Sequence, residues 1–248
     1  MTSLIAGSRL LIAVDVESYS KRLVSEHAQI QDDLNRLIIA AANQARLPYD
    51  DWIVQPQGDG QLIMVPIDDA EPRYIDEFMR HLDSGLNRHN RNLVPEAKLR
   101  LRVAMDHGPA DVAANGFAGD PPITACRLRD SDVCREALAV TDAPLVLILS
   151  PGLYRDLVTA ERTTHDVTEF VEVDIDELKV AMTGWLWRPR ERKAESLSEA
   201  RNRRNSRPAG AASFHQKADV INNVNDGVHH TGPGTLVFGT VVNGSGHE

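Results

Sequence analysis

The sequence predicts an α/β fold in which a β-sheet is covered by helices. Short apolar runs of strand length recur between residues 8 and 188, and segments whose apolar residues repeat at helical spacing separate them. Taken in order, these segments read βαββαββ and then αβαββ. Such an alternation is typical of a domain in which helices pack on a sheet, so we expect one domain over residues 8–188.

The expected strands are short and mostly apolar. Residues 10–16 form a continuous apolar run, LLIAVDV, as in a buried strand. Residues 52–54 and 61–65 are two strands joined by an Asp-Gly turn, which is a strong hairpin signal. Residues 99–105 alternate apolar and basic side chains, so one face of this strand should be exposed. The remaining expected strands are residues 145–149, 169–173 and 180–186.

Four segments have the character of helices. In residues 21–46 the apolar side chains recur every three or four positions, and Pro48 ends the pattern. Residues 72–86 form a second helix with Pro72 in its first turn. The other two expected helices are residues 132–140 and 151–158.

Composition is that of an ordinary soluble protein. Of the 248 residues, 42% are hydrophobic and 25% are charged, which suffices for a sizeable core. The longest apolar runs are far shorter than a membrane span, and residues 10–16 do not form a signal peptide. Two cysteines, Cys126 and Cys134, are too few for a disulfide framework and are expected to be buried. We expect a cytoplasmic protein that does not contact a membrane.

The net charge of −9 argues against a general nucleic-acid binder, which needs clustered Lys and Arg. The charge is uneven, because residues 188–207 hold eight basic and only three acidic residues. We interpret residues 189–213 as a flexible basic linker, and favour this over a nucleic-acid contact.

Residues 214–248 differ in kind from the rest. They are rich in Asn, Gly and His, and have too few apolar residues for a core of their own. Residues 235–242, TLVFGTVV, are β-prone, uncharged and free of Pro, a composition that can pair with copies of itself. One hypothesis is that this tail recruits the domain to itself or to a partner; it loosely resembles amyloid-type signalling motifs attached to bacterial effector domains. A disordered terminus or an extra strand on the sheet edge is the favoured interpretation.

The carboxylates of Asp15 and Asp59 are expected to lie close together. Asp15 ends the first expected strand, and Asp59 lies at the tip of the expected hairpin. In a βαββ unit these two elements are neighbours, and two carboxylates beside a polyphosphate make an oxygen-rich site for Mg²⁺. Two ions there can activate a hydroxyl and neutralise a leaving phosphate. Taken singly, Asp59 is also explained as a turn former and Asp15 as a helix N-cap.

Four segments in register resemble the class III nucleotidyl cyclases. Residues 11–20, LIAVDVESYS, are similar to the family's opening strand, and residues 57–62, QGDGQL, to its hairpin. Residues 101–108, LRVAMDHG, resemble its R-x-A/G-x-H-x-G strand, and residues 116–128, which end in ITACRL, its G-x-x-V-N-x-A-x-R-L helix start. The resemblance covers about residues 10–186. It implies a ferredoxin-like βαββαβ core, an α+β sandwich whose sheet is mainly antiparallel.

The resemblance implies a metal site and a phosphate loop. Asp15 and Asp59 match the two aspartates that bind two Mg²⁺ or Mn²⁺ ions, with the backbone carbonyl of Val16 as a further ligand. The turn that contains Ser18 and Ser20 matches the loop whose N–H groups hold the triphosphate.

The resemblance also implies a site shared between two subunits of a head-to-tail homodimer. Arg127 matches the arginine that stabilises the transition state from the partner subunit. The plainer alternative is a helix-surface arginine paired with a carboxylate such as Asp130. Lys179 falls near the late lysine of the family that binds phosphate.

Three positions depart from the family pattern. Ile123 stands where the family has an Asn that hydrogen-bonds the ribose, after the unusual pair Pro121-Pro122. Gln55 and Gly116 stand at the two positions that read the purine in adenylate and guanylate cyclases. An amide still offers a donor and an acceptor to a base edge. Pyrimidine cyclases of bacterial anti-phage signalling depart from the purine pattern as well, and we expect this chain to resemble them in being small and free of fused sensors.

Two functions follow from these residues. The first is cyclisation of a nucleoside triphosphate to a 3′,5′-cyclic nucleotide and pyrophosphate, with Asp15, Asp59 and Arg127 as the catalytic set. The second is a catalytically degenerate cyclase fold that serves as a binding or interaction module for its tail. Retention of the catalytic set favours the enzyme, whereas Ile123 and Gln55 favour the module.

Overall fold

A seven-stranded sheet forms the centre of the protein. The computed structural model describes residues 7–67, 71–177 and 180–187, and its strands follow the order β2-β3-β1-β4-β7-β9-β8. Only the β4–β7 pair is parallel in this sheet. The strands are β1 (Ser8–Val16), β2 (Ile53–Pro56), β3 (Gly60–Pro66), β4 (Leu101–Pro109), β7 (Leu145–Leu149), β8 (Phe170–Glu177) and β9 (Val180–Trp187). The predicted class, a mainly antiparallel sheet covered by helices, is confirmed.

The helices lie between the strands as expected, with changed ends. The first helix begins later than predicted, because a 3₁₀ turn, Tyr19–Lys21, intervenes before α1. The second expected helix is one uninterrupted helical segment, in which α2 continues through a π-helical stretch, Tyr74–Phe78, into α3. The helices are α1 (Val24–Gln44), α2 (Glu71–Arg73), α3 (Met79–Asn90), α4 (Asp120–Asp130), α5 (Asp132–Ala139) and α6 (Pro151–Leu153).

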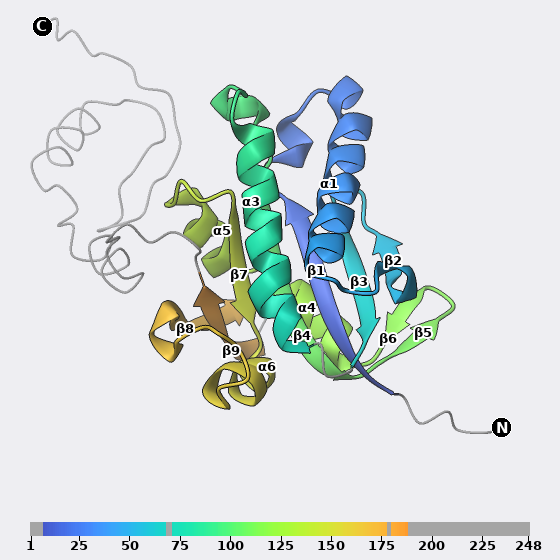
Figure 1. Ribbon diagram of the computed structural model, residues 1–248, viewed down its shortest axis with the longest axis vertical. Coiled ribbons are helices and arrows are strands. Elements are labelled where there is room, and N and C mark those ends of the chain that lie inside the picture. Colours follow the sequence, from blue (N-terminus) through green and yellow to red (C-terminus); the bar gives the residue numbers. More distant parts are fainter. Residues whose placement is uncertain (1–6, 68–70, 178–179, 188–248) are drawn as a thin grey trace, which may run out of the picture. The chain divides into compact units, whose positions relative to one another are not determined.

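Helices cover both faces of the sheet. Helices α1 and α3 lie across one face (Figure 1), where Leu10 and Ile12 of β1 share a core with Ile38 and Phe78. Helix α4 packs on β1 and β4 from the other side, over the alternate side chains of those strands. A strand buried on both faces must be apolar throughout, which explains the continuous apolar run of β1.

The prediction of an exposed face on the strand after residue 99 is wrong. Ala104 on that face is fully buried beneath α4, and the Arg102 side chain is only 15% exposed because it is paired with a carboxylate. Alternation of apolar and basic residues predicts a solvated face only when the basic groups lack buried partners.

A second hairpin was not predicted. Strands β5 (Asp111–Ala113) and β6 (Gly116–Ala118) pair antiparallel, with Gly116 at a φ of 121°. The turn consists of Ala114 and Asn115, and the Asn-Gly step at the start of β6 is a hairpin signal that would have indicated a turn here.

Several predictions concern residues outside those described. The basic linker 189–213, the tail 214–248 and Lys179 all lie there, so they stay predictions. Among the described helices, none is long and apolar enough to cross a membrane. Of the two cysteines, Cys134 is buried, and burial raises the pKa of its thiol to about 12, whereas Cys126 is only half-buried.

Candidate active site

Asp15 lies near the end of β1, between two neighbouring strands. In the ladder it pairs with Gly60 of β3 on one side and with Arg102 of β4 on the other. Its side chain accepts two hydrogen bonds from Arg102, one of them from Nε to Oδ2 at 3.0 Å. The alternative of a helix N-cap is therefore wrong, because the carboxylate serves the Arg102 guanidinium and not a helix terminus.

Asp59 lies in the loop of the β2–β3 hairpin, beside the end of β1. Its backbone carbonyl accepts a hydrogen bond from the Val16 N–H at 3.0 Å, so hairpin tip and strand end are joined. Burial raises the pKa of Asp15, and the charge of Asp59 raises it further, while Arg102 opposes both. The tip of the hairpin therefore adjoins the end of β1, as the order of these elements along the chain predicted.

The close approach of the hairpin to β1 requires a glycine. A Cβ placed on Gly60 would lie 2.1 Å from the backbone carbonyl oxygen of Val14, a distance that no side chain permits. From the other side, Gln31 of α1 donates from Nε2 to the Gly58 carbonyl at 2.8 Å and to the Tyr19 hydroxyl at 2.9 Å. Turn and hairpin are therefore held against the same helix.

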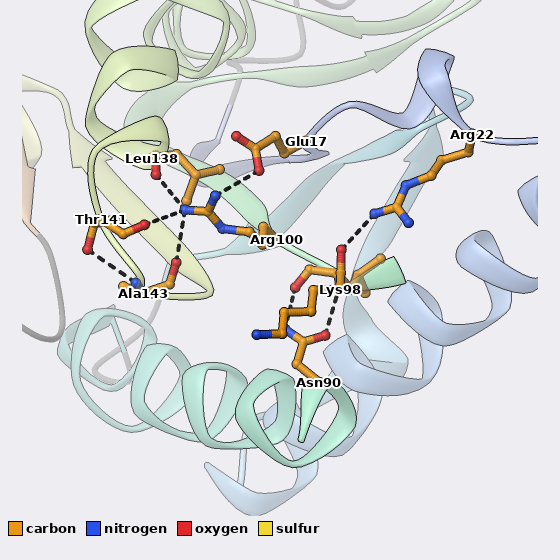
Figure 2. Close-up of polar contacts among 9 residues, drawn as sticks. Glu17, Arg22, Asn90, Lys98, Arg100, Leu138, Thr141 and Ala143 are labelled. Atoms are coloured by element: carbon orange, nitrogen blue, oxygen red, sulfur yellow. Dashed lines mark hydrogen bonds and ion pairs between the residues drawn. The ribbon is translucent and has the colours of Figure 1, made fainter. Parts of the chain in front are cut away.

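The turn after β1 is held by contacts between Glu17 and Arg100. The Glu17 carboxylate lies 3.1 Å from the Arg100 guanidinium, which also donates to the carbonyls of Leu138, Thr141 and Ala143 (Figure 2). The Glu17 N–H donates to the Arg100 carbonyl at 2.9 Å, so this N–H is not open to a phosphate.

The rest of the turn faces solvent. Ser18 and Ser20 are exposed, and Ser18 adopts the left-handed conformation with a φ of 59°. Because α1 begins only at Val24, the turn leads into a short 3₁₀ helix and not directly into a long helix terminus.

Gln55 and Gly116 are in contact, although sixty residues separate them in sequence. A Cβ on Gly116 would lie 2.4 Å from Gln55 Oε1, so the glutamine amide fills the space of the missing side chain. Gln55 Oε1 is buried and has no hydrogen-bond partner within the described chain. The two positions that the resemblance assigns to base reading thus form one surface, contributed by β2 and the β5–β6 hairpin.

Arg127 is exposed on α4, on the same side as Ile123, which is 50% exposed one turn earlier. Its proposed structural partner, Asp130, is instead bound by Arg129, from Nε to Oδ1 at 2.8 Å. Arg127 therefore does not form the ion pair that was its plainer explanation. The prolines before Ile123 lie in the first turn of α4, where a missing N–H costs nothing.

Two arginines of the site were missed from sequence. Arg102 binds Asp15, and Arg129 binds Asp130 and the hairpin residue Gln57, from Nη1 to Oε1 at 2.6 Å. The alternation in β4 gave Arg102 the appearance of a surface residue, and no pattern marks Arg129. Among the described residues, no group of three or more His, Cys, Asp or Glu side chains could hold a metal by itself.

Comparison with known proteins shows the fold. No family model and no curated protein matches the sequence. The adenylate/guanylate cyclase/hydrolase from Silicibacter pomeroyi has a TM-score of 0.52 at 16% identity, over 73% of this chain and 96% of that one. A bacterial light-regulated adenylyl cyclase has a TM-score of 0.50 at 12% identity, over 77% of this chain and 54% of that one. The chain therefore has the fold of a class III nucleotidyl cyclase catalytic domain, as the resemblance implied.

Proposed function

We propose that this protein is a nucleotide cyclase that converts a nucleoside triphosphate into a 3′,5′-cyclic monophosphate and pyrophosphate for intracellular signalling. The observation that carries the proposal is the meeting of Asp15 and Asp59 at the end of β1. On a cyclase fold, these are two oxygen donors beside a turn whose Ser18 and Ser20 are exposed.

The residues present fit a pair of Mg²⁺ or Mn²⁺ ions. Asp15, Asp59 and the Val16 carbonyl would hold them, since carboxylate and carbonyl oxygens are the ligands these ions prefer, and the nucleotide phosphates supply further oxygens. Bound ions lower the pKa of an attacking hydroxyl and offset charge on a leaving phosphate. In the reaction the 3′-oxygen bonds to the α-phosphorus, the bond from that phosphorus to the pyrophosphate oxygen breaks, and the hydroxyl proton passes to solvent.

The triphosphate is held by the turn after β1. Ser18 and Ser20 are exposed there and can donate from hydroxyl and backbone groups. Lys179, which lies outside the described residues, adds a positive charge to this binding if it serves as the late lysine that the resemblance implies.

Arg127 completes the site of a second subunit in a head-to-tail homodimer. It lies on the exposed side of α4, while the arginines whose charges act on Asp15 are Arg102 and Arg129 of the same chain. Ile53 on β2, Val112 on β5 and Ile123 on α4 are exposed apolar side chains that a dimer interface can cover. An arginine directed at the developing charge lowers the barrier of the partner's reaction.

Gln55 reads the base. Gly116 opposite it carries no side chain, so the usual pair of purine-reading groups is replaced by a single amide, whose Oε1 is buried against Gly116 without a hydrogen-bond partner in the described chain. We therefore propose a base selection that differs from that of the usual purine cyclases.

The test is incubation of the full-length protein with ATP, GTP, CTP and UTP in turn, with Mn²⁺ present, and identification of products by mass spectrometry. We expect a cyclic nucleotide from at least one of them, and an Asp59→Ala protein that has lost activity by about 10³-fold or more, since bound metal contributes several kcal/mol. Activity that survives this substitution contradicts the metal assignment.

The degenerate module remains the second candidate, and one observation favours it. Ile123, at the ribose-binding position, presents an exposed apolar side chain that cannot hydrogen-bond a sugar. A protein that yields no cyclic product from any of the four nucleotides, while remaining folded, would establish this alternative.

A further inference from the structure

Arg129 is a buried arginine to which the proposed reaction assigns no role. Its side chain is only 10% exposed, at the last turn of α4. Nε and Nη2 donate to the two carboxylate oxygens of Asp130 at 2.8 and 2.9 Å, which fixes the plane of the guanidinium. Nη1 is left to point at the β2–β3 hairpin, where it donates to Gln57 Oε1 at 2.6 Å.

Gln57 is the residue through which this contact reaches the site. It begins the loop that carries Asp59, and its N–H donates to the Gly60 carbonyl at 2.9 Å, which closes the loop. The Cys126 side chain, about one turn earlier on α4, lies close enough to Gln57 to affect the pKa of its thiol, which burial raises. The loop is thus held on one side by α4 through Gln57 and on the other by α1 through Gln31 and the Gly58 carbonyl.

Arg127 and Arg129 lie on opposite sides of α4. Residues two apart on an α-helix point about 200° apart, so Arg127 is exposed while Arg129 is buried toward the hairpin. The Arg129 charge also acts on Asp15 and opposes the rise in the pKa of that carboxyl. Arg129 therefore touches the hairpin of Asp59 through Gln57 and favours the ionised form of Asp15.

We propose that Arg129 is a positioning residue that clamps the hairpin loop 57–60 to α4, and so sets the place of the Asp59 carboxylate relative to Asp15. The clamp consists of Asp130, Arg129 and Gln57. Its consequence for metal binding rests on the proposed function, whereas its consequence for the hairpin does not.

The first experiment measures the hairpin directly, by hydrogen–deuterium exchange of the full-length protein. Arg129→Met and Gln57→Ala should each speed exchange of the Gln57 and Val16 amides by about tenfold, the effect of losing one charge-assisted hydrogen bond. The double variant should exchange no faster than either single one, because both remove the same contact. Arg135→Met is the control, since Arg135 forms an exposed Arg–Asp pair with Asp132 at 3.0 Å on the next helix, α5. Unchanged exchange in both single variants overturns the clamp.

The second experiment measures Mn²⁺ binding by electron paramagnetic resonance, without turnover. Gln57→Ala is the deciding variant, because it breaks the clamp and keeps the Arg129 charge. We expect its Mn²⁺ dissociation constant to rise by about tenfold or more, as for other groups that orient metal ligands. Equal binding by wild type and variant overturns the positioning role and leaves the proposed function intact. If the wild type neither binds Mn²⁺ nor forms product, the proposed function fails, and the exchange data alone decide the clamp.

Discussion

Asp15 combines a buried position with a charge that the proposed reaction needs. It is 6% exposed, and burial raises its pKa despite the hydrogen bonds from Arg102. A raised pKa in the folded state means that the neutral form fits the fold better than the ionised form. At neutral pH the ionised carboxylate therefore lowers the stability of the protein, a common feature of functional sites.

Replacement of Asp15 by Asn should increase the stability of the protein and abolish its activity. At pH 7 we expect the melting temperature to rise, by about 2–4 °C for each kcal/mol relieved, while cyclase activity is lost. The gain should shrink as the pH falls through the raised pKa of Asp15 and vanish near its ordinary value of 3.8, where the wild-type group is also neutral. Calorimetry across this pH range tests it, with the exposed Asp132→Asn as control. A gain that does not depend on pH would contradict this account.

At the scale of elements, the β2–β3 hairpin depends on the absence of a side chain at Gly60. Its neighbour across the ladder is Asp15, and β1 leaves no room for a Cβ. The hairpin cannot retreat without breaking the bond between the Asp59 carbonyl and the Val16 N–H. Stability and site geometry are therefore coupled at this residue.

Gly60→Ala should both destabilise the protein and displace Asp59. Overpacking costs about 1–3 kcal/mol, so the melting temperature should fall by roughly 2–12 °C, with a parallel loss of Mn²⁺ binding. Gly152→Ala is the matched control, because a Cβ there meets only ordinary contacts at 3.8 and 4.0 Å. A Gly60→Ala protein as stable as the wild type would show that β1 and the hairpin can separate freely.

At the scale of the whole molecule, the proposed function requires a second chain to supply Arg127. Arg127 is exposed, and the charges that act on Asp15 come from other arginines of the same chain. A two-fold dimer would bring Arg127 of each subunit to the aspartates of the other and create two equivalent sites.

Mixing inactive variants tests this arrangement. Asp59→Ala and Arg127→Ala proteins, after subunit exchange, should recover about a quarter of wild-type activity, because half of the dimers are mixed and each keeps one intact site of two. A mixture of Asp15→Ala and Asp59→Ala should recover nothing, since both residues serve the same half of a site. Equal behaviour of the two mixtures, with exchange verified by mass spectrometry, would argue against the head-to-tail dimer.

The contact between the hairpin that carries Asp59 and the strand end that carries Asp15 could be predicted, because the strand, the turn and their order are each marked in the sequence. An apolar run with a terminal Asp marks the strand, an Asp-Gly turn marks the hairpin, and a βαββ order makes the two adjacent. The exact ends of helices and the π-helical segments could not be predicted, since they depend on how each helix packs.

The sequence by itself determined the fold class and the β2–β3 hairpin, which puts Asp59 beside the end of β1, because strand and turn signals are carried by neighbouring residues. Only the tertiary structure decided the partners of the charges: Arg102 meets Asp15 across 87 residues, and Arg129 meets Gln57 across 72. These contacts depend on strand register and on which side of α4 faces the sheet. No local pattern encodes them, because the local sequence around an arginine is the same whether its side chain faces water or a buried carboxylate.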